Sequence, residues 1–309
     1  MEHSFNENRG LTLVGFLVTA CVIIFLLLML LLLTLAYNRP VPVIAMRVVC
    51  QTNLKLLGTA MTVYANDYDG RFPQLPGEGP WSKKLGFDYD LKEPDFKGLQ
   101  SNTGRTITAS WYLLVREADV SSKSFVCPLS KEKGFEGKKP YNFDIVENWD
   151  FGDNPYEHVS YGMHNPYGKY PANDKLGTNF AVAADMSPWI KAGDFVSTPN
   201  EYNNPQIIKA NDETTYKYGN SFNHPKKKMN WRGQDKEIIG TATGQNVLFV
   251  DGHTEFTRQP NCGVNDDNIY TYWSTEKNPT EQDIQGGTQP TARDKENDAK
   301  SQDDSFLVL

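Results

Sequence analysis

The sequence predicts an α+β protein: a membrane-spanning helix, then a second, amphipathic helix packed on an antiparallel sheet with long loops. Three observations support this prediction. Residues 11–37 are apolar and carry no charge, and residues 43–67 repeat apolar side chains at helical spacing. Beyond position 65, Gly, Pro, Asn and Asp recur every few residues, which is typical of short strands and turns.

The apolar segment 11–37, LTLVGFLVTACVIIFLLLMLLLLTLAY, is long enough to cross a bilayer. As a helix it would extend over ~40 Å, whereas a bilayer core measures ~30 Å. A cleaved secretory signal has a shorter apolar core of roughly 7–15 residues. We therefore expect one membrane-spanning helix in contact with lipid, followed by a break over 38–42, where Pro40 and Pro42 remove backbone donors.

The segment 43–67 is the predicted amphipathic helix. Its end is expected near Asn66 or Asp67, because Asp69-Gly70 forms a turn signal directly after it. Apolar side chains at helical spacing predict a broad buried face made of Leu54, Leu56, Leu57, Ala60, Met61, Val63 and Tyr64.

Length, composition and motifs indicate which classes of function to expect. The chain has 309 residues, enough for one or two domains with a core. Its formal charge of -7 does not suggest a nucleic-acid partner, which usually meets a basic face. The sequence shows no Gly-x-Ser-x-Gly, P-loop or nucleotide fingerprint and no nucleophile beside a base, so we do not expect an enzyme.

The stretch NRGLTLVGFLV, residues 8–18, resembles the leader junction of type IV prepilins and type II secretion pseudopilins. The resemblance implies a leader-like segment 1–10, cleavage after Gly10 by a prepilin peptidase, and methylation of Leu11. That family usually carries Glu as the fifth residue of the mature chain, where its carboxylate guides assembly. The corresponding residue here is Gly15, so that carboxylate has no counterpart.

The run CQTNLKLLGTAMTVYANDYDGRFP, residues 50–73, resembles prepilin-like proteins abundant in Planctomycetes and their relatives. Further matching islands are FVCP at 125–128, SYG at 160–162, AAD at 183–185 and the stretch GQNVLFVDGHTEF at 244–256. That family has a His before a conserved Asp-Gly. The matching residues are His224, Asp251 and Gly252, if the lysine-rich stretch 225–243 is a loop insertion.

The resemblance implies a pilin-like globular domain over 43–273. It implies a non-catalytic component of a pilus-like or type II secretion apparatus, anchored once in the inner membrane with its domain in the periplasm or outside. Its partners would be like subunits or secretion-apparatus proteins. The alternative is a membrane-tethered extracytoplasmic binding domain, for a polysaccharide or a protein, that does not assemble into filaments.

The Asp-Gly of GQNVLFVDGHTEF lies between two runs of strand-forming residues. This predicts a hairpin with a type I′ turn, in which Asp251 and Gly252 both take positive φ. The competing interpretation is a metal site in which His224 folds back beside Asp251 and His253. The chain shows no His-x-x-x-His spacing, and we predict no metal site.

Four cysteines are present. Cys21 lies in the apolar segment, where it acts as a small apolar side chain. In an oxidising compartment we expect a disulfide between Cys50 and Cys127, with Cys262 free or replacing one of the two. A zinc site is not favoured, since the chain has no Cys-x-x-Cys pair.

Two acidic clusters, 265–268 and 67–69, are interpreted as turn and cap residues. Calcium is the alternative ligand, but neither cluster has the spacing of a known calcium loop, and we predict no cofactor. The tail 274–309 is rich in Gln, Asp, Lys, Thr and Gly, a composition that predicts disorder.

Overall fold

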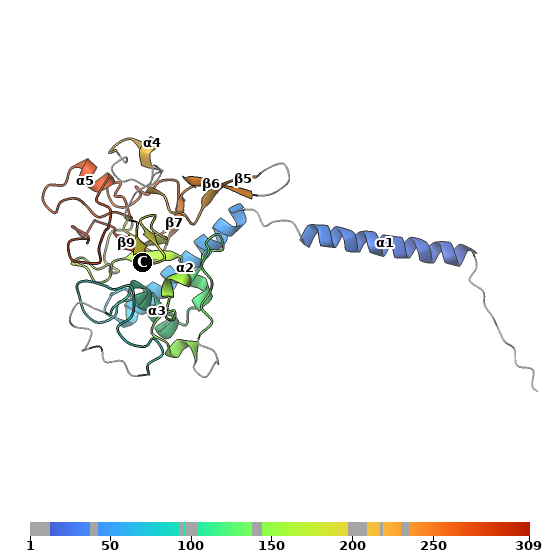
Figure 1. The fold of residues 1–309 in the computed structure, drawn as a ribbon, viewed down its shortest axis with the longest axis horizontal. Coiled ribbons are helices and arrows are strands. Elements are labelled where there is room, and N and C mark those ends of the chain that lie inside the picture. Colours follow the sequence, from blue (N-terminus) through green and yellow to red (C-terminus); the bar gives the residue numbers. More distant parts are fainter. Residues whose placement is uncertain are drawn as a thin grey trace, which may run out of the picture. The chain divides into compact units, whose positions relative to one another are not determined.

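The structure is a computed structural model. It describes residues 13–37, 43–92, 96, 104–137, 144–196, 209–216, 219–229 and 235–309. The chain divides into two units, 1–42 and 43–309, and each is considered by itself. The second unit is called the head here. Figure 1 shows the long helix of the first unit and the mixed helices and strands of the head.

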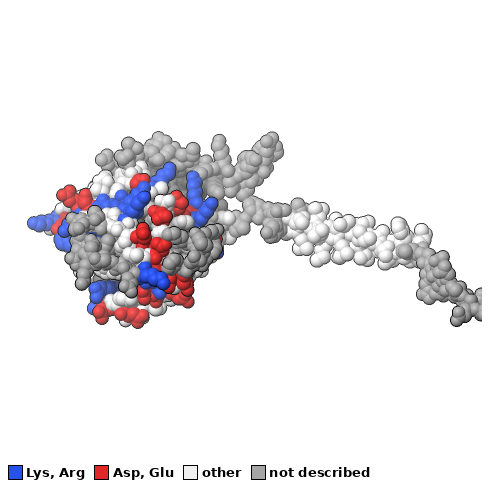
Figure 2. All heavy atoms as spheres, turned by 60° about the horizontal axis from the view of Figure 1, so that its bottom comes forward, with Lys and Arg blue, Asp and Glu red and all other residues white. Residues whose placement is uncertain are grey.

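Helix α1, Leu13–Tyr37, is the one described element of the first unit. Its stretch Leu13–Thr34 is long and apolar enough to cross a membrane. Large apolar side chains are exposed along its length, Leu13 by 78 % and Leu32 by 66 %. Figure 2 shows α1 free of charged side chains, whereas acidic and basic side chains intermingle on the visible face of the head. Such an apolar surface is stable against lipid rather than water.

Helix α2, Val43–Asp67, opens the head and packs on the central sheet. It ends at Asp67 as predicted, because Asp69 and Gly70 take φ of 57° and 80° and the Gly70 N–H caps the Ala65 carbonyl at 2.8 Å. Gly58 allows the close approach to the sheet: a Cβ there would lie 2.5 Å from Leu248 Cδ1.

The predicted apolar face of α2 is only partly buried. Its buried residues are Leu54, Leu57, Ala60, Met61 and Tyr64. The prediction is wrong for Leu56 and Val63, which are 46 % and 47 % exposed. These two residues lie on the side of the helix that faces away from the core. With Ile44, Val48 and Val49, which are also exposed, they form what we call the α2 outer stripe.

A five-stranded antiparallel sheet is the centre of the head, with strand order β8-β7-β2-β1-β9. Its strands are β1 (Tyr161–His164), β2 (Ala181–Asp185), β7 (Gln245–Phe249), β8 (Thr254–Thr257) and β9 (Leu307–Val308). Every residue of β1, β2 and β7 is buried. The α+β class with an antiparallel sheet is therefore confirmed.

The remaining elements are short and lie around this sheet. The helices are α3 (Ile107–Glu117), α4 (Glu213–Tyr216), α5 (Glu281–Gln285) and the 3-10 turns η2 (Ser122–Phe125), η3 (Ile145–Glu147) and η4 (Pro155–Glu157). Two-stranded ribbons are formed by β3 (Ile190–Lys191) with β4 (Asp194–Phe195), and by β5 (Pro225–Met229) with β6 (Asp235–Ala242). The stretch 225–243, expected to be a loop, thus contains a ribbon.

The prediction of a disordered tail over 274–309 is wrong. This segment forms α5 and strand β9, and β9 pairs with β1 at Met163↔Val308 and His164↔Leu307. Its acidic side chains fasten it: Asp298 accepts from the Asn165 amide at 2.8 Å, and Asp304 accepts from the Trp273 backbone at 3.0 Å. Polar composition predicted disorder because it does not reveal such long-range bonds.

Candidate functional site

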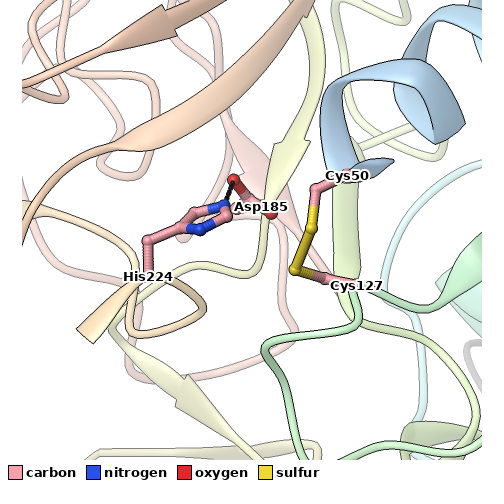
Figure 3. A group of neighbouring side chains, drawn as sticks. All are labelled: Cys50, Cys127, Asp185 and His224. Atoms are coloured by element: carbon pink, nitrogen blue, oxygen red, sulfur yellow. Dashed lines mark hydrogen bonds and ion pairs between the residues drawn. A yellow bond between two sulfur atoms is a disulfide. The ribbon is translucent and has the colours of Figure 1, made fainter. Parts of the chain in front are cut away.

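Four side chains from distant parts of the chain meet between α2 and the sheet (Figure 3). Cys50 comes from α2, Cys127 follows η2, Asp185 ends β2, and His224 directly precedes β5. All four have an exposed fraction of 0 %. We call them the buried cluster.

Asp185 is the hub of the cluster. Its Oδ2 accepts hydrogen bonds from His224 Nε2 at 2.8 Å and from the Asn246 backbone N–H at 2.6 Å. The Asn246 side-chain amide lies 3.2 Å from the same oxygen, and the Asn223 amide donates to Oδ1 at 3.1 Å. A buried carboxylate is tolerated when donors surround it in this way. The Asn246 side-chain amide also lies 3.0 Å from His224 Nε2, so this nitrogen contacts both the Asp185 carboxylate and the Asn246 amide.

Cys50 and Cys127 form the predicted disulfide, with their Cα atoms 5.0 Å apart and a sequence separation of 77. Polar contacts hold the second cysteine in place. Ser160 Oγ accepts from the Cys127 N–H at 2.5 Å, and the Asn53 amide donates to the Val126 carbonyl at 3.1 Å. The disulfide thus joins α2 to the segment after η2 directly beside Asp185. Cys262 is free, and burial raises the pKa of its thiol to about 12.

Some atoms in and beside the cluster could bind a metal ion or form hydrogen bonds that the described residues do not supply. One ligand atom from each of the four residues lies within 4.8 Å of all the others. Two buried atoms beside them, His224 Nδ1 and Asn246 Oδ1, have no hydrogen-bond partner in the described part of the chain. Unpaired buried polar atoms are uncommon and require an explanation.

Arg47 is a cation that interacts electrostatically with Asp185. Its guanidinium stacks on the Phe256 ring at 3.8 Å and donates to Thr243 Oγ1 at 3.1 Å. Burial lowers the pKa of Arg47, Arg258 lowers it further, and the attraction of Asp185 opposes both. The negative charge of Asp185 is therefore balanced in part by a neighbouring arginine.

The second Asp–His pair, Asp251 and His253, is at the tip of the β7–β8 hairpin. The hairpin is confirmed, but the type I′ turn is wrong. Gly252 has a φ of 82°, and Asp251 is not among the described residues with positive φ. Hydrogen bonds from Gly252 N to Phe249 O and from Phe249 N to His253 O define instead a type I turn followed by a left-handed Gly.

The alternative metal site of His224, Asp251 and His253 does not form. His224 lies beside Asn246 near the start of β7, whereas Asp251 lies in the turn beyond the other end of that strand. His253 instead stacks on Phe249 and bonds to Asp251, and this pair is about half exposed.

The two acidic clusters are turns in the structure. Asn265 and Asp266 both take a φ of 58°. Asp267 is buried and accepts from Trp273 Nε1 at 2.8 Å and from the Ser305 N–H at 2.8 Å. Burial and the neighbouring Asp304 raise the pKa of Asp267 well above its usual range. Its donors come from the chain itself, so Asp267 fastens the C-terminal segment to the sheet.

The proposed processing residues Gly10 and Leu11 lie outside the described residues. Among the signature residues, the structure unites His224 with Asp185 and leaves Asp251 and Gly252 in the hairpin turn. Sequence reasoning missed the partners Asp185, Asn223 and Asn246. The sequence offered one signal for these residues. Polar residues stand at the ends of strand-forming runs, Asp185 at the end of AVAAD and Asn246 at the start of QNVLF.

No protein-family model, curated protein or solved structure matches this chain.

Proposed function

We propose that the chain is a non-catalytic, prepilin-like membrane-anchored subunit of a pilus-like or type II secretion apparatus, with its head outside the cytoplasm. The observation that carries the proposal is the order of elements. An uninterrupted apolar helix is followed by a helix that packs one face on an antiparallel sheet. The leader-like junction at residues 8–18 precedes this arrangement in the sequence.

The α2 outer stripe supports assembly with like subunits. Ile44, Val48, Leu56 and Val63 are 70 %, 54 %, 46 % and 47 % exposed, and they recur at spacings that place them along one side of the helix. An exposed apolar row on a helix is stabilised when another helix covers it. Like subunits anchored in the same membrane would bring such rows together.

The disulfide supports the extracytoplasmic location, because structural disulfides persist in oxidising compartments. It ties α2 to the rest of the head at a distance of 77 residues along the chain. A subunit that transmits force from its anchor to its head benefits from such a link.

The decisive experiment is the mass of the N-terminal peptide after expression with a prepilin peptidase. Processing predicts a chain that begins at methylated Leu11, and a Gly10→Val variant should then retain Met1. An intact N-terminus in the presence of active peptidase contradicts processing by this machinery.

Assembly is tested separately by chemical cross-linking in membranes. The double variant Leu56→Glu/Val63→Glu should lose cross-linked oligomers, because charges replace the apolar row. Lys175→Glu, an exposed substitution elsewhere on the head, is the matched control and should leave them unchanged. Equal cross-linking of both variants excludes the outer stripe as the contact.

A groove gives reason to keep the second candidate, a membrane-tethered binding domain. It measures about 860 Å³, and Tyr64, Tyr68, Phe96 and Trp149 line it together with polar residues. Tyr64 and Tyr68 stack with their ring centroids 4.0 Å apart, and Tyr68 is 40 % exposed. Aromatic faces beside polar groups suit polysaccharide rings. Calorimetric titration with neutral oligosaccharides tests this candidate, and Tyr68→Ala should abolish any binding.

A further inference from the structure

The buried cluster has the composition of a metal centre whose two sulfur ligands are joined to each other. We propose that, once the Cys50–Cys127 disulfide is reduced, the head binds one zinc-class divalent ion through Cys50, Cys127, Asp185 and His224. This inference does not depend on the proposed function, since it concerns only the interior of the head.

The donor spacing fits a tetrahedral ion after small movements. Zinc bonds of about 2.0–2.3 Å at tetrahedral angles place ligand atoms ~3.3–3.8 Å from one another. The four donor atoms all lie within 4.8 Å of one another, and His224 Nε2 is 2.8 Å from Asp185 Oδ2. Reduction frees the two sulfurs to separate while α2 and the segment after η2 hold their backbones.

The surrounding groups would support the ion. Asp185 is oriented by the Asn246 backbone N–H and the Asn223 amide, which are the kind of outer hydrogen bonds that position metal ligands. With a metal on Nε2, the neutral His224 ring would carry its proton on Nδ1, which has no hydrogen-bond partner in the described residues.

The charges also balance. Two thiolates and one carboxylate contribute three negative charges, and a divalent ion with the neighbouring Arg47 contributes three positive charges. Arg47 interacts electrostatically with Asp185 in the disulfide form. Two thiolates and an imidazole favour zinc-class ions over calcium or magnesium, which prefer oxygen ligands.

The chemical step is balanced when a phosphine is the reductant. The S–S bond accepts two electrons from the phosphine, water supplies the oxygen of the phosphine oxide, and two thiols form. Each thiol then loses its proton as its sulfur binds the ion, so two protons are released per metal bound. The disulfide and the metal centre are thus alternative states of the same side chains.

The test uses the full chain in detergent micelles, reduced anaerobically with a phosphine and titrated with Co²⁺ alone. We expect one equivalent to bind, with a thiolate-to-cobalt charge-transfer band and the intense visible bands of a tetrahedral site. Zn²⁺ should then displace the cobalt. The oxidised chain should show no such band. Cys262→Ser should retain the band, since that cysteine lies outside the cluster.

His224→Gln and Asp185→Asn should each weaken cobalt binding by at least ~10–100-fold, and Cys50→Ala/Cys127→Ala should abolish the charge-transfer band. Near-UV circular dichroism on the same samples shows which variants keep a packed head. The proposal is overturned if the reduced wild-type chain binds no cobalt, or if the band persists without Cys50 and Cys127. His253→Gln, at the exposed pair, is the matched control and should bind cobalt as the wild type does.

Discussion

The head contains two Asp–His pairs that differ in every respect except their chemistry. His224 and Asp185 are 39 residues apart in sequence, and both side chains are fully buried. His253 and Asp251 are two residues apart, and their side chains are 45 % and 39 % exposed. The pair visible in the sequence is a turn, whereas the pair that joins the end of β2 to the residue before β5 becomes visible only in the fold.

The largest expected effect concerns the disulfide, which adjoins only the buried pair. Cys50→Ala/Cys127→Ala should lower the free energy of unfolding of the head by ~4–5 kcal/mol, because a 77-residue loop is released in the unfolded chain. Denaturant titration of the full chain, monitored by tryptophan fluorescence, measures this. A loss below about 1 kcal/mol would show that the packing around the cluster holds these segments without the cross-link.

The same substitution at both acids tests the comparison directly. Asp185→Ala should destabilise the head by ~3–5 kcal/mol, because it leaves several buried donors without their acceptor. Asp251→Ala should change stability by no more than about 0.5 kcal/mol, as expected for an exposed turn residue. Equal losses of stability in denaturant titrations would show that burial does not distinguish the two acids.

Asp150 is a buried acid whose hydrogen-bond donors include no histidine. It therefore shows the effect of burial apart from that of pairing with a histidine. Its donors are the hydroxyls of Thr106 and Thr108 and the Phe151 N–H, and burial raises its pKa to about 7. The unfolded value is about 3.9. The protonated acid is favoured in the fold, so its contribution is complete below about pH 4 and is lost as the pH rises to about 7.

The free energy of unfolding should therefore fall by up to about 4 kcal/mol over that range, and Asp150→Asn should flatten this part of the pH profile. Denaturant titrations of both proteins at several pH values give the measurement. An unchanged slope in the variant would assign the pH dependence to other buried acids, with Asp304 first among them because burial raises its pKa to about 7 as well.

The smallest effect is expected at the exposed pair. The His253 backbone N–H, followed by its side chain, lowers the pKa of Asp251. The sign is opposite to that for Asp150: the contribution is present above about pH 4 and lost as the pH falls further. Because solvent screens this pair, Asp251→Asn should alter stability by less than about 0.5 kcal/mol at any pH. A larger change in the same titrations would indicate that the hairpin tip contacts more than solvent.

Local signals predicted local structure well. The Asp69-Gly70 turn located the end of α2, and Asp251-Gly252 located the β7–β8 hairpin, although not its turn type. The turn type failed because the Asp-Gly pair fits both a type I′ turn and a type I turn with a left-handed Gly. The sequence distinguishes these only through strand register, which other parts of the sheet determine.

Long-range contacts were harder to foresee. The Cys50–Cys127 pairing was predicted correctly because few soluble cysteines compete. The partnership of Asp185, His224 and Asn246 was missed because nothing in local spacing unites residues from three strands or their neighbours. The ordered structure of 274–309 was missed for the same reason. Asp267, Asp298 and Asp304 accept hydrogen bonds from residues that are distant in sequence.

Strand β9 has a consequence for how the head is made. It lies beside β1, from which it is separated by more than 140 residues, and β1 in turn pairs with a strand that begins at Ala181. Only β7 and β8 in this sheet are joined by a tight turn. Strands that are far apart in sequence lose much conformational entropy before their contacts can form. We therefore expect the head to fold slowly. A newly synthesised molecule would then need chaperones to cover the edge of β1 until β9 pairs with it.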